Sequence, residues 1–457
     1  MNILLISANI ANTPYSVYPL GLSMVAASLH QAGYQVRQFD FLASGKSKEA
    51  LLKEMREFVP DVIGISIRNI DNVNLLNEQR YIDAVGEIVR EVRTVSAAKI
   101  VLGGSGFSIM PEEILQQTGA DYGVVGEGEV LLLDFLEQAS KGTYPGEKIL
   151  RSQTLLSASH IPSALYDSRI MDFYLENGNV ASVQTKRGCI HSCTYCSYPF
   201  LEGNQLRPRD AKTVVDDIEI LLHKHKAKYI FFTDSLFNDD QGNYISVLKE
   251  MKKRGIVVPW TAFFKPQGFT KETVSLMLKT GLKAVEIGAD ATTDITLKKL
   301  GKTFSFRDVI ACNDLLTGHG ISVAHYFMFG CPGETKDTVL EGIANIKSLK
   351  KTVSFIFMGI RILPHTPLAR LAQEQDIISF DQNLFKSVYY ISPSIERAWL
   401  EETLTEVFRG IRNCVFPPDA LGSSLAFLHK LGYSGSLWEM LIPGKRKGNR
   451  KRKNVTK

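Results

Sequence analysis

Three of the six cysteines in this chain of 457 residues lie close together, as Cys189, Cys193 and Cys196 in the spacing C-x3-C-x2-C. A cube of four irons and four sulfides is normally held by four cysteine thiolates. A trio without a fourth cysteine nearby would ligate three irons and leave the fourth open to a ligand that does not come from the protein. The spacing therefore favours a [4Fe–4S] cluster with one open coordination position.

Two other interpretations of the trio stay open from its spacing alone. His191 could complete a structural zinc site, although zinc ligands usually come as two C-x-x-C pairs or as one pair with two histidines. The three side chains could also be simple buried thiols. The segments that follow the trio, described below, favour the cluster.

The composition sets the class of protein in which such a cluster would sit. The length suggests two or three domains, at ~100–200 residues each. Six cysteines are too few for a disulfide scaffold, and an oxygen-sensitive cluster fits a reducing cytosol, so we expect a cytoplasmic protein. The start, Met1–Ser7, has no cationic segment and indicates a strand rather than a signal peptide. No apolar run reaches the ~18 residues that a membrane span needs.

The basic charge is concentrated at the end of the chain. Residues 444–457 hold eight Lys or Arg and no acid, so the formal charge of +5 minus these eight leaves −3 for the rest. Such a run is typical of a solvated, disordered tail, and a weak contact with an anionic surface is the alternative. No nucleic-acid partner is expected.

Residues 1–140 alternate continuous apolar strands with amphipathic helices, which predicts a doubly wound parallel sheet. Strands are expected at 2–7, 34–40, 62–67, 99–104 and 121–125, and helices up to 31 and at 48–58 and 78–95. Such sheets bind ligands at the carboxyl ends of their strands. Two glycine-rich segments, residues 103–106 and 126–129, lie at such ends, either to approach a ligand or to make tight turns. The first strand is not followed by G-x-G-x-x-G, so NAD or FAD is unexpected.

After a segment with little periodicity, residues 141–179, which we interpret as a linker, residues 180–370 repeat a strand and a helix six times. This repetition predicts an α/β barrel with its chemistry at the carboxyl ends of the strands. The expected strands are 181–186, 229–234, 257–263, 284–290, 322–329 and 354–363. Residues 371–443 are expected to be a small, mostly helical cap, with an amphipathic helix at 396–412.

The cysteine motif resembles the signature of the radical-SAM enzymes, in which S-adenosylmethionine (SAM) binds the open iron. Three features of residues 1–140 resemble the cobalamin (B12)-binding domain fused to such barrels: the P-L-G-L opening, the strand ending at Ser66 and Ile67, and the paired G-G and G-E-G-E loops. The resemblance covers about residues 1–370 and implies a partial (β/α)6 barrel. The cobalamin contacts that it implies are Pro19, Gly21, Ser66, Arg68, Asn69, Gly103, Gly104, Ser105, Gly126, Glu127, Gly128 and Glu129.

One motif of other B12 proteins is missing. There is no D-x-H-x-x-G, whose histidine binds cobalt, so the resemblance implies cobalamin without a histidine on its lower face. Arg68 or Asn69 would lie nearest the cobalt, where an arginine cannot ligate and would disfavour Co(III) relative to Co(I). A surface arginine in a salt bridge is the alternative for Arg68.

The resemblance also implies a set of SAM contacts at the strand ends. The backbone of Tyr195 would lie beside the adenine, and Asp234 and Asn238 belong to the segment that recognises the amino group. The remaining contacts are Lys265 for the carboxylate, Glu286 or Asp290 for the ribose, and Gly330 and Glu334 in a turn close to G-x-P-G-E-T. A helix cap is the ordinary alternative for Asp290.

Several further side chains carry weaker expectations. Arg361 is assigned to the pocket mouth. Tyr389 and Tyr390 could line the substrate site, although core packing is the more common explanation for each of them. Cys331 is expected to be a buried small side chain. His325 and Tyr326 occupy opposite faces of one strand, and a packed histidine is expected over a catalytic one.

The resemblance implies a cobalamin-dependent radical-SAM C-methyltransferase with three cofactors: a [4Fe–4S] cluster, SAM and cobalamin. A methyl group would pass from SAM through methylcobalamin to an unactivated carbon, after hydrogen abstraction by a 5′-deoxyadenosyl radical. The implied partners are a small-molecule substrate, lipid-like or a secondary metabolite, and an electron donor such as flavodoxin or ferredoxin.

Three alternatives to methyl transfer are compatible with parts of this sequence. A cyclase or rearrangement enzyme would use the same cofactors without net methyl transfer, and a corrinoid or metal carrier would not be catalytic. A methylthiotransferase is disfavoured because residues 1–140 contain no cysteine for a second cluster.

Overall fold

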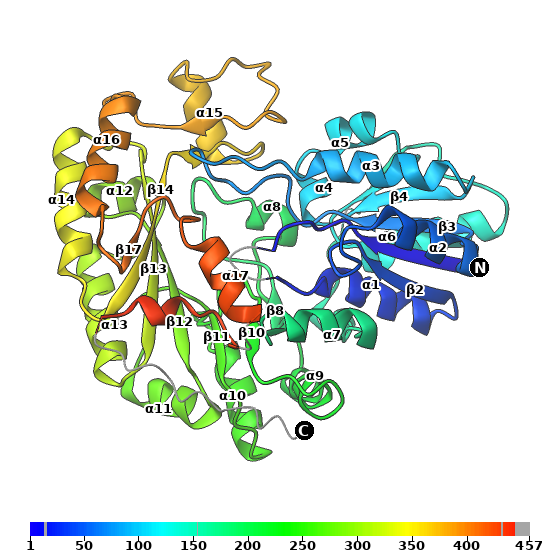
Figure 1. The fold of residues 1–457 in the computed structure, drawn as a ribbon, viewed down its shortest axis with the longest axis horizontal. Coiled ribbons are helices and arrows are strands. Elements are labelled where there is room, and N and C mark those ends of the chain that lie inside the picture. Colours follow the sequence, from blue (N-terminus) through cyan, green and yellow to red (C-terminus); the bar gives the residue numbers. More distant parts are fainter. Residues whose placement is uncertain (13–15, 153, 431–432, 444–457) are drawn as a thin grey trace, which may run out of the picture.

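Two parallel sheets lie side by side, each covered by helices (Figure 1). The structure is a computed structural model that describes residues 1–12, 16–152, 154–430 and 433–443. The predicted basic tail, 444–457, lies outside these residues. No helix in the described ranges is long and apolar enough to cross a membrane.

The first sheet has six parallel strands in the order β2-β1-β3-β4-β5-β6. Its order reverses between β1 and β3, and such a reversal opens a crevice at the carboxyl ends of the strands. The strands are β1 Asn2–Ser7, β2 Gln35–Asp40, β3 Val62–Ser66, β4 Lys99–Gly103, β5 Tyr122–Val125 and β6 Ile149–Arg151. Helices α1 Leu20–Gln31 and α6 Gly128–Ser140 cover one face, and α2 Lys48–Phe58, α3 Ile82–Arg93, α4 Ser105–Ile109 and α5 Pro111–Thr118 cover the other.

The second sheet is a curved half-barrel of seven strands in the order β17-β14-β13-β12-β11-β10-β7. The strands are β7 Ala181–Val183, β10 Ile230–Phe232, β11 Trp260–Phe264, β12 Ala284–Asp290, β13 Ser322–Phe329, β14 Thr352–Met358 and β17 Cys414–Val415. Its outer helices are α9 Ala211–His223, α10 Asn243–Lys253, α11 Lys271–Thr280, α12 Asp294–Lys299, α13 Phe306–Gly318 and α14 Lys336–Ser348, with α16 Arg397–Phe408 beside them.

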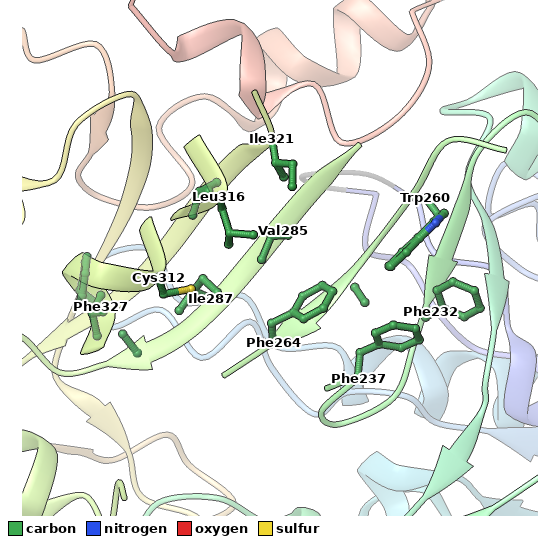
Figure 2. Packing of buried hydrophobic residues seen from close by; sticks show 14 of the residues in the cluster. Phe232, Phe237, Trp260, Phe264, Val285, Ile287, Cys312, Leu316, Ile321 and Phe327 are labelled. Atoms are coloured by element: carbon green, nitrogen blue, oxygen red, sulfur yellow. The ribbon is translucent and has the colours of Figure 1, made fainter. Parts of the chain in front are cut away.

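Alternate residues of these strands build two separate cores. Side chains that point outward, such as Phe232, Trp260 and Phe264, pack against the helices in a continuous apolar layer (Figure 2). Their neighbours point inward and form a smaller lumen cluster. This alternation is what a parallel sheet closed around its own interior requires.

The sequence anticipates both sheets, and the differences from expectation are local. The segment 141–179 is not structureless, because β6 completes the first sheet and α7, Ser168–Glu176, packs on the barrel core. The seventh barrel strand, β17, was not predicted. The helix expected at 396–412 ends at Phe408.

The segment Trp438–Leu441, η2, plugs the amino-terminal end of the half-barrel. The indole of Trp438 is 2% exposed, lies in the lumen cluster, and donates to Glu286 at 3.2 Å. Ser322, the first residue of β13, donates to Glu439 at 2.8 Å. The lumen is therefore sealed at this end.

Replacing the plug residue should destabilise the whole chain. Trp438→Ala removes a buried indole from the lumen and should lower the free energy of unfolding by about 3–5 kcal/mol. Trp438→Phe keeps most of the volume, loses only the hydrogen bond to Glu286, and should cost about 1–3 kcal/mol. Urea unfolding of the protein checks both values. Equal, small effects would show that the segment does not fill the lumen.

Candidate functional site

A cavity of about 420 Å³ lies at the carboxyl edge of the first sheet and extends to the half-barrel. The ends of the strands of the first sheet supply one wall, including Ser7, Ser66 and Gly103. Residues of the barrel strands and of the loops after them supply the other, including Gln184, Thr233 and Phe263. One cavity therefore meets both sheets.

The structure brings nearly all the predicted cobalamin contacts to this cavity. Asn69 is the exception, since it is exposed and does not line the cavity. The lining includes Pro19, Gly21, Ser66, Arg68, Gly103, Gly104, Ser105, Gly126, Glu127, Gly128 and Glu129. Their contacts with a corrin stay predictions.

Glycine has a different structural role in each of the two glycine-rich loops. Gly104 has φ +94°, and a Cβ there would lie 2.5 Å from the carbonyl oxygen of Ile67, so the backbones of two loops meet at this point. Gly126 has φ +90° with open space beside it. Ser105 donates to the carbonyl of Arg68 at 2.7 Å. Gly104 thus shapes the loop wall, and Gly126 leaves room for a ligand.

Arg68 is a cationic side chain on this wall. It is exposed, lines the cavity and forms no ion pair with any described residue. The surface salt bridge considered for it is therefore not formed. A cation remains on the wall where the lower face of a corrin was expected.

The three cysteines lie in a single loop that leaves the half-barrel, which we call the cysteine excursion. Strands β8, Lys186–Arg187, and β9, Arg207–Pro208, pair antiparallel at the base of this loop, and we call them its two feet. Gly188 follows β8 with φ +87°, and a Cβ there would lie 1.9 Å from the carbonyl oxygen of Gln205. The excursion can therefore close only with glycine at this position.

The thiols of Cys189, Cys193 and Cys196 are free and half-buried on this excursion. Among the described residues, no three His, Cys, Asp or Glu side chains converge in a preformed metal site. Burial raises the pKa of Cys193, and it raises that of Cys196 to about 12. Three thiols in one loop fit a cluster that is inserted after folding and displaces their protons.

Contacts from other elements hold the excursion in place. Tyr195 donates to Asp290 at 2.5 Å, and Lys302 forms an ion pair with the same carboxylate. The backbone of Thr194 bonds to Leu300 at 3.1 Å and to Leu368, in α15 Pro367–Glu374, at 2.8 Å. Asp290 therefore anchors the cysteine loop. Its predicted contact with ribose stays a prediction.

The predicted contacts of the SAM amino and carboxylate groups are buried and already bonded. Asp234 accepts from the backbone of Thr185 at 2.7 Å and from the ammonium of Lys186 at 3.0 Å. Asn238 bonds the backbone of Lys265 at 3.0 Å. The ammonium of Lys265 is paired with Asp240. These side chains shape the loops after β10 and β11, and the buried ion pair of Lys186 is the feature that sequence reasoning missed.

Glu286 lies in the lumen rather than at a strand end. Its carboxyl accepts from Tyr326 at 2.8 Å and from Trp438 at 3.2 Å, and it is 1% exposed. Burial raises its pKa to about 7, although the two hydrogen bonds lower it. The expected contact with ribose is geometrically disfavoured, because its partners come from the plugged end.

Gly330 and Glu334 belong to the turn after β13, and their contacts with SAM stay predictions. Glu334 accepts from the backbone of Gly330 and, at 2.9 Å, from that of Cys331, so its carboxyl closes the turn. Burial raises the pKa of Glu334 to about 7. Cys331 is fully buried, as expected.

The histidine of β13 is a core residue, as expected. The ring of His325 is fully buried and lies 3.2 Å from the side-chain oxygen of Asn313. Burial lowers its pKa to about 3, so the ring is neutral at neutral pH. Tyr326, on the opposite face of the strand, points into the lumen.

Arg361, Tyr389 and Tyr390 lie outside the lining of this cavity, and their expected places at the pocket mouth and the substrate site stay predictions. Arg361 does not line the cavity, because it is buried and pairs with Asp71 at 2.9 Å. Tyr389 and Tyr390 do not line it either. Tyr390 is buried and donates to Gln375 at 2.7 Å.

Comparison with known proteins agrees with this geometry. The B12 binding domain matches residues 6–136, and the Radical SAM superfamily matches residues 183–346. The chain therefore belongs to the cobalamin-dependent radical-SAM family, whose cofactors are a [4Fe–4S] cluster, SAM and cobalamin.

Individual relatives are distant. The tryptophan 2-C-methyltransferase of Streptomyces laurentii is 25% identical over 449 residues, with 81% of this chain and 74% of that protein covered. The anaerobic magnesium-protoporphyrin IX monomethyl ester cyclase of Rubrivivax gelatinosus is 23% identical, with coverage of 71% and 60%. The structure of the methyltransferase TsrM from Kitasatospora setae, with cobalamin and a [4Fe–4S] cluster bound, has a TM-score of 0.83 at 23% identity and covers 96% of this chain and 97% of that one.

The foot of the cysteine excursion gives a direct test of the cluster site. Gly188→Ala places a Cβ against Gln205 and should lower iron and sulfide content after anaerobic reconstitution to background. Gly33→Ala is the matched control, because Gly33 has the same φ of +87° and nothing within 4 Å. Equal iron content in the two variants would contradict the role of the foot.

The lumen carboxyl predicts a pH dependence of stability. The folded state keeps the proton of Glu286 up to about pH 7, whereas the ordinary value is 4.5. The folded state therefore binds more protons in this window, and its stability falls as the pH rises, by about 1.4 kcal/mol per pH unit at most. Glu286→Gln cannot titrate and lacks this loss. The free energy of unfolding of the variant, measured with urea, should therefore rise relative to that of the wild type between pH 4.5 and about 7. If the free energies of unfolding of the two proteins changed in parallel with pH, this prediction would be contradicted.

Proposed function

We propose that the protein is a C-methyltransferase that moves a methyl group from SAM to an unactivated carbon of a small molecule. The observation that carries the proposal is the single cavity lined by strand ends of the B12-binding domain and by Gln184, Thr233 and Phe263 of the barrel. When bound, cobalamin supplies a transferable methyl group, and the cluster supplies the electron that cleaves SAM.

The residues of the chain hold and orient these groups. The excursion of Cys189, Cys193 and Cys196 offers three thiolates and leaves one iron position for SAM. Arg68 would face bound cobalamin with a cation that cannot ligate a metal. A substrate carbon held between these two walls would gain from proximity, worth about 7–11 kcal/mol for aligned groups.

The barrel side of the cavity favours a substrate with an apolar, flat body. Phe231 and Phe263 pack edge to face, with ring centroids 5.3 Å apart, and both line the cavity. Thr233, Gln184 and Ser182 add neutral hydrogen-bonding groups beside them. An apolar surface with a few convergent polar groups is typical of small-molecule sites.

The similar proteins support methyl transfer, and one of them supports the alternative reaction, cyclisation. The matches include the tryptophan 2-C-methyltransferase and the TsrM structure with tryptophan bound, but also the ester cyclase. The cavity accommodates either outcome, since both reactions begin with SAM cleavage beside a bound substrate.

Deuterium labelling separates these outcomes. The reconstituted protein with cobalamin, SAM carrying a deuterated methyl group and an extract of candidate small molecules should yield a product that gains the deuterated methyl, seen by mass spectrometry. An unlabelled cyclised product would favour the cyclase. Failure to cleave SAM with both cofactors loaded would indicate a carrier.

A further inference from the structure

The G-E-G-E loop of the B12-binding domain is bonded directly to the feet of the cysteine excursion. Arg187, in β8, donates to Glu127 at 2.9 Å and to Glu129 at 2.5 Å. Arg207, in β9, donates to the same Glu127 at 2.7 Å. The loop that was expected to contact cobalamin thus uses its two carboxylates on the other domain.

The pairing of β8 with β9 makes Glu127 necessary. Arg187 and Arg207 are directly opposite each other in the two-residue ladder, where two like charges repel. Glu127 lies between them and accepts from both, and its second oxygen also accepts from the backbone of Leu156 at 2.6 Å. Although burial acts to raise it, the arginines hold the pKa of Glu127 below its ordinary value.

The charged side chains in this cluster are at most 10% exposed. The side chains of Arg187 and Glu129 are 8% and 5% exposed, and those of Arg207 and Glu127 are both 10% exposed. Removing one partner of such a pair is costly, because a charge stays buried without compensation. Arg187 stands two positions before Cys189, so a movement of this foot moves the first cysteine.

We propose that Glu127 and Glu129 are positioning residues that set the distance and orientation of the iron–sulfur cluster relative to cobalamin. This inference rests on the proposed function only in that both cofactors bind. The glycines beside the glutamates line the cobalamin wall, and the arginines begin and end the cysteine loop. A single ion-pair cluster therefore joins the loop at the cobalamin wall to the two strands at the base of the cysteine loop.

The magnetic coupling between the cobalt and the iron–sulfur cluster tests this proposal without a known substrate. With both Co(II) and the reduced cluster paramagnetic, the EPR spectrum of the loaded wild-type protein should show a single, well-defined dipolar interaction, whose strength falls steeply with distance. Glu127→Gln and Arg187→Lys should each weaken or broaden it while iron and cobalamin contents stay at wild-type levels. Methyl transfer from SAM to reduced cobalamin should slow by about 100-fold, the cost of a misplacement near 1 Å.

Asp217→Asn is the matched control. Asp217 pairs with Arg209 at 2.7 Å, both side chains are 3% exposed, and the pair lies within the barrel domain. This variant should lose stability yet keep the wild-type coupling. If Glu127→Gln fails to fold, Glu129→Gln removes a single bond and serves in its place.

The outcomes are distinct. Unchanged coupling and methyl transfer in Glu127→Gln, Glu129→Gln and Arg187→Lys would overturn the proposal, as would equal loss of coupling in Asp217→Asn. A wild-type protein that takes up no cobalamin or iron would instead overturn the proposed function.

Discussion

Buried charge that must be paired is the constraint on which this structure depends. The two domains meet across a cavity that must stay open for cofactors, so apolar packing cannot hold them together there. Ion pairs join them instead: Arg187 with Glu127 and Glu129, which line the cavity, and Arg361 with Asp71, which lie outside its lining. Because an unpaired charge in such a place is costly, each pair restricts the domains to one relative placement.

The same constraint explains why many of the predicted SAM contacts are occupied by the protein itself. Asp234 neutralises the buried ammonium of Lys186, and Asp290 neutralises Lys302. These pairs fix the loops after β10 and β12, on which the open cluster position depends. A carboxylate near a strand end can thus serve a cofactor indirectly, by holding the backbone that faces it.

Local sequence pattern was sufficient for the fold and for the cobalamin wall. Apolar runs with helices between them predicted five strands of the first sheet and six of the second, because burial on both faces leaves a continuous apolar signal. Glycines at strand ends located the cavity. Strands β6 and β17, of three and two residues, carry too little periodicity to be seen and exist only through their neighbours.

The partners of charged residues could not be predicted, because they are set by tertiary contact rather than by spacing. Glu127 and Arg187 are 60 positions apart, and Asp71 and Arg361 are 290 apart. The motif G-E-G-E therefore suggested a ligand contact, while its carboxylates reach the other domain. Glu286 was misplaced for a similar reason, since its partner Trp438 comes from the far end of the chain.

The plugged lumen adds a final constraint on the chemistry. Trp438, Tyr326 and Glu286 close the half-barrel at its amino-terminal end, so a ligand between the sheets cannot pass through the barrel. The cavity that the described residues line lies instead where the domains meet. Arg187, Glu127 and Glu129 line the cavity on that side, so contacts that hold the domains together also shape the space around a bound substrate.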